Sequence, residues 1–286
     1  ICVDSPDFNY QLAKKLKNNK YKNNIIQIVA PTVWAWRKGR AKKFAKVYNE
    51  IFTLFKFEKK FFEKEGLKTT FMGHPISLIE SNHYDESKDK NLIAFLPGSR
   101  ENEITKLFPY FEAIHNYLLA NNVKKYKLFI PTLPHLIDKI TLITNHWQLE
   151  TIISDNNVKN ETLYKSTFIS VTCSGTASLE ISKRLIPQIV LYKLNSLTFF
   201  IFSFLINIRF ANILNILNKK MIVREVVNRD LTIKNLLKSF DTLLNNKIFR
   251  DTQISEVKKC LPEIVNTSNP YDICEKRINE IISTAT

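Results

Sequence analysis

Three short segments combine acidic, hydroxyl and basic side chains directly after apolar, strand-like runs. The first is DSPDFN at residues 4–9. Carboxylates at the end of a strand suit general base catalysis, so Asp4 and Asp7 are candidate bases. The alternative is that Ser5 or Asp7 only caps the helix that begins here.

The second segment is LPGSRENE, which begins at Leu96. A turn of small residues such as Gly98 and Ser99 exposes backbone N–H groups to a phosphate, and Arg100 adds a charged bidentate donor. The sequence lacks the longer glycine-rich loop ending in Lys that marks P-loop nucleotide enzymes. The alternative is an ordinary turn between a strand and a helix.

The third segment is TCSGTASLE, which ends at Glu180. Ser174, Gly175 and Thr176 open a predicted helix, and a helix N-terminus carries about half a positive charge that suits a pyrophosphate. Glu180, about one turn further on, could hold a ribose diol. The alternative is a capped helix with Ser174 or Thr176 as its cap. We expect Cys173 to be a small buried residue rather than a nucleophile.

A fourth segment, VWAWRKGR, places two indole rings beside a basic cluster. Trp34, Trp36 and Arg37 could form a platform for an amphiphilic or phosphorylated ligand. The alternative is that one or both rings pack in the core with their N–H groups bonded. A nucleic-acid site would use the same residues, by stacking and phosphate contact.

The composition limits the classes of partner and cofactor. The 286 residues carry 42 Lys plus Arg against 27 Asp plus Glu, a net charge of +15, which is typical of proteins with anionic partners. Most of the basic residues are Lys, and Asn and Ile are abundant as well, which is the composition that AT-rich codons give. Much of the positive charge is therefore expected on solvated surface Lys side chains without a binding role. Neither the four Cys nor the five His have metal-ligand spacing, so we expect no metal and a reducing compartment. The apolar run Leu197–Ile208 is too short to span a membrane and is either a core helix or an interfacial one.

The elements that must position these residues alternate between strand and helix. Strand patterns at residues 1–4, 25–30, 51–54 and 69–72 precede a polar linker at 77–90, and strands at 92–96, 127–130, 151–153, 168–172 and 188–192 follow it. Helical patterns lie at residues 10–18, 40–47, 57–65, 104–120 and 177–184 and across much of 231–284. This alternation predicts an α/β protein with mostly parallel sheets, divided into domains at 1–78 and 79–286. Ligands of such folds bind beyond the carboxyl ends of the strands, where the three segments lie.

The ordered motifs together resemble the lipid-A-disaccharide synthase family of glycosyltransferases. The resemblance rests on VDSPDFN, APTVWAWRKGRAKK, FKFEKKFFEKEGL, GHP, LPGSRENEI, SGTASLE and YKLNSLTFF, in that order between residues 3 and 200. It implies a GT-B fold, with two Rossmann-like domains facing a central cleft. It also implies an N-terminally truncated chain, because the family has an earlier segment before the residue that matches Asp4.

The resemblance further implies a reaction and roles for several residues. The family joins UDP-2,3-diacylglucosamine to 2,3-diacylglucosamine 1-phosphate (lipid X), releases UDP and needs no metal or cofactor. Asp4 would be the base or would position the acceptor, and Arg100 would stabilise the leaving pyrophosphate. The other residues implied on the acceptor side are Asp7, Asn9, Trp34, Trp36 and Arg37, and those on the UDP-sugar side are Gly98, Ser99, Ser174, Gly175, Thr176, Glu180, Asn215 and Glu225.

Several positions depart from the family pattern. Leu214 replaces a Pro, residues 219–221 replace a Gly-Arg-Glu stretch, Leu185 replaces a Gly and Ser196 replaces another Pro. These changes question the local loop geometry without touching Asp4 or Arg100.

The acylated substrates imply contact with an anionic membrane surface. This would place the protein in the cytoplasm, peripheral on the inner face of the inner membrane. Phe199–Ile208 and Phe55–Phe62, each with neighbouring basic residues, are the predicted contacts. The family also suggests homodimers.

Three alternative functions remain. One is another UDP-sugar enzyme of this fold, such as a peptidoglycan-type transferase or an epimerase. The others are a basic nucleic-acid-binding protein and an inactive relative. The motifs favour the synthase, and we expect no nucleic-acid partner.

Overall fold

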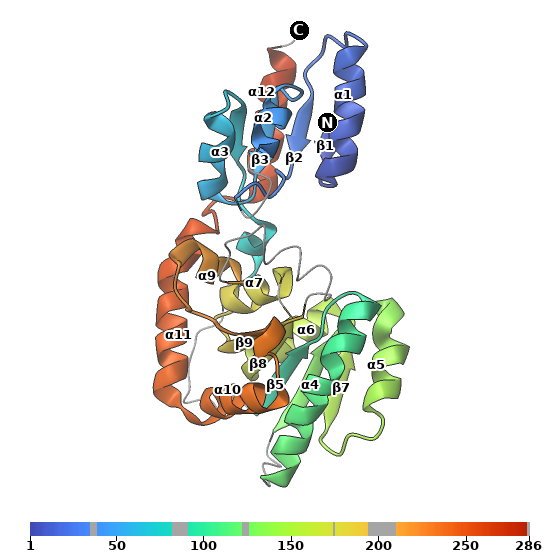
Figure 1. The fold of residues 1–286 in the computed structure, drawn as a ribbon, viewed down its shortest axis with the longest axis vertical. Coiled ribbons are helices and arrows are strands. Elements are labelled where there is room, and N and C mark those ends of the chain that lie inside the picture. Colours follow the sequence, from blue (N-terminus) through green and yellow to red (C-terminus); the bar gives the residue numbers. More distant parts are fainter. Residues whose placement is uncertain (35–38, 82–90, 122–125, 174, 194–209, 285–286) are drawn as a thin grey trace. The chain divides into compact units, whose positions relative to one another are not determined.

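The chain forms two compact units, each with its own parallel sheet. The computed structural model describes residues 1–34, 39–81, 91–121, 126–173, 175–193 and 210–284. The first unit contains Ile1–Ile79 and Leu261–Thr286, and the second contains Glu80–Cys260. Figure 1 shows the elements of both units along the chain, and each unit is described by itself below.

The first unit is built on four parallel strands in the order β1-β2-β3-β4. Each strand is followed by helical structure, which is the connection that parallel pairing requires. The elements are β1 (Cys2–Val3), α1 (Pro6–Asn18), β2 (Ile26–Ile28), α2 (Arg40–Ala45), β3 (Glu50–Thr53), α3 (Lys59–Glu63), β4 (Lys68–Phe71) and α12 (Pro270–Ser283), with short 3₁₀ turns at Lys56–Glu58, Pro75–Leu78 and Leu261–Glu263.

Alternate side chains of the first sheet enter two different cores, as the two-residue period of a strand requires. On one face, Ile51 packs in a cluster with Ala13 of α1 and Phe44 of α2. On the other face, Phe52 packs in a cluster that includes Cys274 of α12. Both faces of the sheet are therefore covered by helices.

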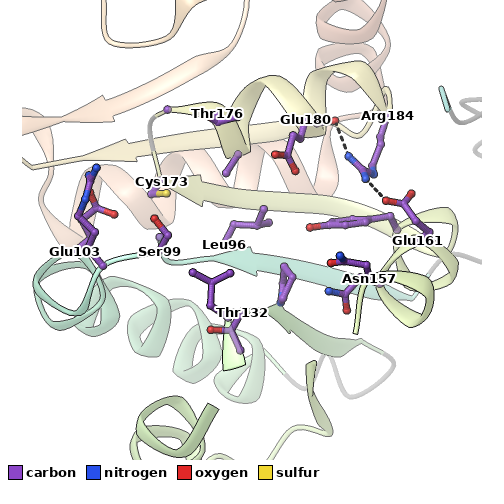
Figure 2. A pocket seen from close by; sticks show the side chains of 18 residues that line it. Leu96, Ser99, Glu103, Thr132, Asn157, Glu161, Cys173, Thr176, Glu180 and Arg184 are labelled. Atoms are coloured by element: carbon purple, nitrogen blue, oxygen red, sulfur yellow. Dashed lines mark hydrogen bonds and ion pairs between the residues drawn. The ribbon is translucent and has the colours of Figure 1, made fainter. Parts of the chain in front are cut away.

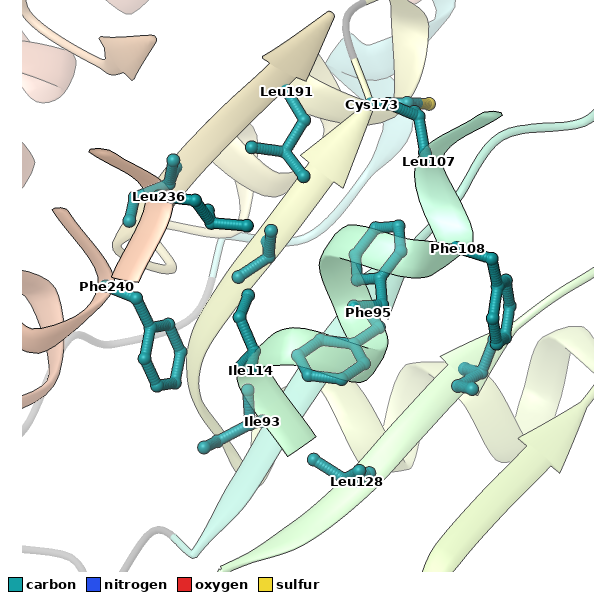
Figure 3. Close-up of a cluster of buried hydrophobic side chains, with 14 of the residues drawn as sticks. Ile93, Phe95, Leu107, Phe108, Ile114, Leu128, Cys173, Leu191, Leu236 and Phe240 are labelled. Atoms are coloured by element: carbon teal, nitrogen blue, oxygen red, sulfur yellow. The ribbon is translucent and has the colours of Figure 1, made fainter. Parts of the chain in front are cut away.

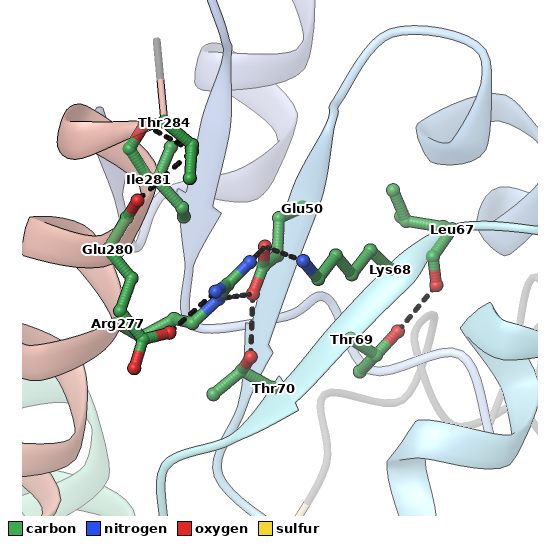
Figure 4. Close-up of polar contacts among 9 residues, drawn as sticks. All are labelled: Glu50, Leu67, Lys68, Thr69, Thr70, Arg277, Glu280, Ile281 and Thr284. Carbon is green, nitrogen blue, oxygen red and sulfur yellow. Dashed lines mark hydrogen bonds and ion pairs between the residues drawn. The ribbon is translucent and has the colours of Figure 1, made fainter. Parts of the chain in front are cut away.

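The last helix returns to the first sheet, which differs from the expected domain division. The sequence pattern assigns residues 79–286 to the second domain, whereas residues 261–286 are grouped with the first unit. The physical reason is specific side-chain pairing. Arg277 of α12 donates to both carboxylate oxygens of the buried Glu50, at 2.9 and 2.8 Å, and Lys68 lies 3.7 Å from the same carboxylate (Figure 4). An amphipathic pattern predicts a helix but does not say which sheet the helix will cover.

The second unit has six parallel strands in the order β10-β9-β8-β5-β6-β7. The chain moves outward from β5 through β6 to β7 and then continues on the other side of β5 with β8. The elements are β5 (Leu92–Leu96), α4 (Glu101–Ala120), β6 (Lys127–Pro131), α5 (Ile137–Thr144), β7 (Thr151–Ser154), α6 (Asn157–Lys165), β8 (Thr167–Cys173), α7 (Thr176–Lys183), β9 (Gln188–Tyr192), α9 (Ile213–Asn218), β10 (Arg224–Val227), α10 (Ile233–Asn245) and α11 (Lys247–Cys260). This order creates a topological switch point between β5 and β8.

The main core of the second unit lies between the sheet and the helices α4 and α10. Ile93 and Phe95 of β5 point into it and meet Ile114 of α4 and Phe240 of α10 (Figure 3). The alternate residues of β5, including Ala94, enter a smaller cluster with Ile181 of α7. Burial of each large apolar side chain contributes about 1.5–3 kcal/mol, so this packing fixes the strand ends that carry the functional loops.

The expected elements agree with the structure at β5 and β9, whose bounds match, and within a few residues at the other predicted strands. The expectation of mostly parallel sheets is confirmed, since every strand pairing in the described ranges is parallel. Four elements were not expected from the sequence, namely α5, α6, α9 and β10. The predicted interfacial segment Leu197–Ile208 lies outside the described residues. Within the part of the chain that the structure describes, no helix has the length and apolarity needed to cross a membrane.

Candidate functional site

A cavity of about 550 Å³ lies at the switch point of the second sheet. It opens beside the ends of β5 and β8, which pair directly through Leu96 and Thr172. Open α/β sheets bind ligands at this position, outside the carboxyl ends of the strands. Figure 2 shows the cavity, whose wall includes predicted residues from both loops together with residues of α6 and α7: Gly98, Ser99, Arg100, Glu103, Asn157, Glu161, Tyr164, Cys173, Gly175, Thr176, Glu180 and Arg184.

The loop after β5 has a shape that depends on glycine. Gly98 has a φ of 116°, and a Cβ built on it would lie 2.6 Å from Oε2 of Glu103. The space that the glycine leaves is therefore filled by the carboxylate of Glu103. That carboxylate accepts a hydrogen bond of 2.8 Å from Nη1 of Arg100, whose side chain is 79% exposed. The structure thus places an exposed cation, paired with the partly exposed carboxylate of Glu103, on the wall of the cavity.

The loop after β8 supplies the opposite wall. Gly175 has a φ of 127° and stands at the cap position of α7, without a side-chain cap. Capping by Thr176 is therefore wrong, and Ser174 lies outside the described residues. Cys173 is buried, and burial raises the pKa of its thiol to about 12. This confirms the expectation of a small buried residue, because a thiol of such high pKa carries almost no thiolate near neutral pH.

Glu180 lies on α7 among charged and aromatic neighbours. The guanidinium of Arg184, a residue 3% exposed, lies 4.3 Å from the ring centre of Tyr164 and pairs with Glu161. It also donates to the backbone carbonyl of Glu180 at 3.3 Å (Figure 2). Burial raises the pKa of the Glu180 carboxyl above its ordinary value, the charge of Arg184 lowers it, and the charge of Glu161 raises it. The protonation state of Glu180 therefore depends on Arg184.

Asn215 and Glu225, both predicted to bind the UDP-sugar, do not line the cavity. Nδ2 of Asn215 donates to Glu225 at 2.6 Å and to the carbonyl of Val223 at 2.7 Å, and its Oδ1 accepts from two backbone N–H groups. Glu225 also accepts from the N–H groups of Ala211 and Asn212, at 2.8 Å each. In this arrangement the two side chains hold the backbone around α9 and β10 in place.

In the first unit, Asp4 follows β1 in an unusual backbone conformation. Its φ is 50°, and that of Ser5 is 38°, a left-handed region that non-glycine residues seldom adopt. The carbonyl of Asp4 accepts hydrogen bonds from the side-chain amides of Asn9, at 2.7 Å, and Gln27, at 3.0 Å. The two amides hold the backbone of Asp4 while its side chain stays exposed.

The other acidic-loop residues have distinct surroundings. Asn9 is 9% exposed and donates to the carbonyls of Val3 and Asp4, which is a positioning contact. Asp7, in the first turn of α1, forms an ion pair with Arg40 of α2. Ser5 stands at the cap position without a side-chain hydrogen bond to the helix, so capping by Ser5 is wrong.

Trp34 packs against neighbouring side chains with its N–H group bonded, which is the alternative to an exposed ligand platform. Its Nε1 donates to Oε1 of Glu58 at 3.0 Å, and its ring lies edge-on to Phe57 with centres 5.5 Å apart. Glu58 is 4% exposed, and burial raises the pKa of its carboxyl to about 7, against the lowering effect of hydrogen bonds from Phe55 and Trp34. Trp36 and Arg37 lie outside the described residues.

The aromatic side chains of Phe55–Phe62, a predicted membrane contact, are not fully exposed. Phe62 is in the core, and Phe55, Phe57 and Phe61 are half-buried. Phe55 stacks on Phe57 and on His74, with ring centres 5.8 and 5.6 Å apart. The second predicted contact, Phe199–Ile208, lies outside the described residues.

Several residues that shape the sites were missed by sequence reasoning. Gln27 lies inside the β-branched run of β2, and Tyr164 and Glu161 lie on a helix that was not expected. Arg184 was placed at the end of a predicted helix, where a basic residue is common for electrostatic reasons. An isolated polar residue in an apolar strand was the available signal for Gln27.

The fold is shared with enzymes that use nucleotide sugars. The UDP-GlcNAc 2-epimerase of Neisseria meningitidis, whose crystal structure contains UDP-GlcNAc, aligns with a TM-score of 0.56 at 12% identity, over 96% of this chain and 73% of its own. Two parallel sheets with a cavity at a switch point define a protein of the GT-B class.

The sequence comparison identifies the family within that class. The family described as Lipid-A-disaccharide synthetase matches residues 1–271. The lipid-A-disaccharide synthase of Rickettsia bellii is 32% identical over 282 residues, covering 95% of this chain and 73% of its own length. That of Rhodospirillum centenum is 30% identical over 268 residues, covering 90% and 66%. The chain belongs to the lipid-A-disaccharide synthase family, which makes it a glycosyltransferase that acts on lipid A precursors, and it spans about two thirds to three quarters of the length of these relatives.

Proposed function

We propose that the protein transfers 2,3-diacylglucosamine from UDP to the 6-hydroxyl of 2,3-diacylglucosamine 1-phosphate. The bond between the donor's anomeric carbon and the pyrophosphate oxygen breaks, and a bond from that carbon to the acceptor's oxygen forms with inversion. The hydroxyl proton goes to a base, and UDP leaves. The observation that carries the proposal is the switch-point cavity, because two glycine-containing loops and the half-buried carboxylate of Glu180 line it and suit a nucleoside diphosphate.

The donor half of the proposal assigns the cavity to UDP. The backbone N–H groups near Ser99, Ser174 and Gly175 would bind the pyrophosphate at the start of α4 and α7. Arg100 would release Glu103 and bind the leaving phosphate. Breaking the Arg100–Glu103 pair costs little free energy, because an exposed ion pair contributes only about 0–1 kcal/mol. Glu180 would accept hydrogen bonds from the ribose hydroxyls.

The acceptor half assigns the proton to Asp4. A carboxylate that is exposed while its backbone is fixed by two side-chain amides is suited to accept a proton from a bound hydroxyl. The side-chain amide of Asn9 donates to the backbone carbonyl of Asp4. We therefore propose that Asn9 positions Asp4 and does not bind the acceptor directly. Trp34 would contribute its half-buried ring to the acceptor side, held by Glu58.

We also propose that the protein works at the inner face of the inner membrane. Both substrates carry acyl chains, and basic residues near anionic lipid contribute about 1 kcal/mol each. A homodimer is part of the same proposal. Co-sedimentation with anionic vesicles and measurement of molar mass by light scattering test these two statements separately from the reaction.

The reaction is tested with the full-length protein, both substrates and no added metal, followed by product analysis. We expect a phosphorylated disaccharide and UDP in equal amounts. Asp4→Ala and Arg100→Ala should each lower kcat/KM at least about 10²-fold, the scale of a lost base or charge stabiliser. Asp272→Ala, at an exposed position of α12, is the matched control.

Two results would contradict the assignment. If the folded protein forms no disaccharide, the proposed reaction is refuted. Conversion of the UDP-sugar without an acceptor would favour an epimerase. A loss of tenfold or less in either variant would remove that residue from contact with the reacting groups.

A further inference from the structure

A second cavity, of about 410 Å³, lies in the first unit between α1 and α2. We call it the α1–α2 pocket, and its wall includes Asp7, Tyr10, Arg40, Lys43 and Phe44. Asp7 stands three residues after Asp4, in the first turn of α1. The two helices follow the neighbouring parallel strands β1 and β2, so the pocket lies toward the carboxyl edge of the sheet, where ligands of such folds bind.

Arg40 is held rigidly in this pocket. Its side chain is only 10% exposed, and its guanidinium lies 5.6 Å from the ring centre of Phe44. Phe44 is itself stacked between Tyr10 and Tyr48, with ring centres 5.2 and 5.1 Å away. A guanidinium that is fixed on an aromatic stack loses little conformational entropy when it binds an anion.

The present partner of Arg40 is easily exchanged. Nη2 of Arg40 pairs with the carboxylate of Asp7, whose side chain is 74% exposed. A guanidinium has five N–H donors in a planar fork, so it can also engage a phosphate in bidentate fashion. Lys43 lies one turn further along α2, so among the described residues of the pocket wall there are two cations and one carboxylate, that of Asp7.

We propose that the α1–α2 pocket binds the phosphomonoester of the acceptor, with Arg40 as the main ligand and Lys43 as a secondary one. This inference rests on the proposed function, because it takes the acceptor to be a sugar 1-phosphate with its hydroxyl at Asp4. Asp7 then acts as the counter-ion of Arg40 in the free enzyme and gives way to the phosphate. The site distinguishes a phosphorylated acceptor from the same sugar without its phosphate.

The binding test uses the soluble head group alone. Glucosamine 1-phosphate is titrated into full-length wild-type, Arg40→Gln and Arg100→Ala protein and followed by calorimetry. We expect Arg40→Gln to weaken binding about 10- to 100-fold, the range for a lost charged hydrogen-bonding partner, while Arg100→Ala binds like wild type. Unchanged binding in Arg40→Gln, or loss in Arg100→Ala instead, would overturn the proposal. Because this readout needs no turnover, it stands or fails separately from the reaction.

The kinetic test compares two acceptors. Arg40→Gln should raise KM for the phosphorylated acceptor about 10- to 100-fold and leave KM for UDP-2,3-diacylglucosamine and the rate with dephosphorylated acceptor unchanged. Equal losses with both acceptors would show a structural role and contradict the site. Arg40→Lys and Lys43→Gln provide milder variants should Arg40→Gln not fold, and each should show a smaller effect of the same kind.

The last comparison separates the acceptor from a lipid head group. Vesicles of phosphatidic acid in phosphatidylcholine should bind wild type and Arg40→Gln equally. Weaker vesicle binding in the variant, together with normal binding of glucosamine 1-phosphate, would assign the pocket to the membrane surface and refute its role toward the acceptor.

Discussion

The side-chain amide of Gln27 donates a hydrogen bond of 3.0 Å to the backbone carbonyl of Asp4, across two neighbouring strands. The same nitrogen lies 2.9 Å from the carbonyl of Ile28 and 3.2 Å from that of Val29, which has a φ of 68°. Gln27 is completely buried. Residues in this left-handed region cost about 1–3 kcal/mol each, so a buried amide that bonds their carbonyls offsets strain beside Asp4.

Replacement of Gln27 should therefore impair the reaction through Asp4. Gln27→Leu keeps the approximate volume but leaves three carbonyls without this donor, and we expect a loss of about 1–3 kcal/mol in the free energy of unfolding. The kcat should fall about tenfold while KM for the UDP-sugar is unchanged. Urea denaturation and steady-state kinetics measure the two effects.

The background of Asp4→Ala provides the control for that prediction. If Gln27 acts through Asp4, adding Gln27→Leu to Asp4→Ala should not lower kcat further. Multiplicative losses in the double variant would mean that Gln27 supports activity by another route.

Arg184 should control the pH dependence of UDP binding. The charge of Arg184 lowers the pKa of Glu180, so Arg184→Gln should raise that pKa further. Only the ionised carboxylate accepts both ribose hydroxyls, so the pH below which UDP affinity falls should move upward in the variant. Calorimetric titration of UDP between pH 5 and 8 measures this. Lys165→Gln, at an exposed position of the neighbouring α6, should keep the wild-type profile. An affinity profile of the variant with the same pH midpoint as that of the wild type would contradict the coupling.

Gly98 should not tolerate a side chain. The Cβ of Gly98→Ala would meet Glu103 at 2.6 Å in a backbone conformation with φ of 116°, so we expect destabilisation by about 1–3 kcal/mol and weaker UDP binding. Gly39→Ala is the comparison for stability, since its φ is −66° and an added Cβ has nothing within 4 Å. Thermal unfolding and UDP titration together decide the result, and normal UDP affinity in Gly98→Ala would exclude a role of the loop in binding.

Glu58 should make the first unit less stable as the pH rises. Burial raises its pKa from 4.5 to about 7, so the folded state binds more protons than the unfolded state between these values. The stability contributed by the protonated form is complete below about pH 4.5 and is lost by about pH 7, a change of up to about 3 kcal/mol. The difference in unfolding free energy between wild type and Glu58→Gln should follow this curve. A difference that does not change with pH for Glu58→Gln would refute the raised pKa.

The sequence predicts well which edge of the second sheet carries the candidate loops, because this signal is topological. The sequence places the loops carrying Gly98 and Gly175 at the carboxyl edge of a parallel sheet, and the structure adds that β5 and β8 are neighbours in that sheet. The sequence does not distinguish ligands from structural networks. Asn215 and Glu225, which we predict to bind the UDP-sugar, also bond to each other, and the sequence does not show this contact.

Residues that act through long-range contacts could not be predicted from local patterns. Gln27 meets Asp4 only after two strands pair, and Arg40 meets Asp7 only after α1 and α2 pack. The position of α12 depends on Arg277 finding Glu50, and amphipathic periodicity contains no information on such a partner.

The pairing of Glu50 with Arg277, 227 residues apart, has a consequence for biosynthesis. A ribosome that has released the first four strands has not yet made the helix that covers one of their faces. The second unit is formed by one continuous stretch, Glu80–Cys260, whereas the first sheet keeps an apolar face and the Glu50 carboxylate uncovered until α12 has been made. Completion of the first unit is therefore tied to the end of synthesis of this stretch of chain, although its strands are made first.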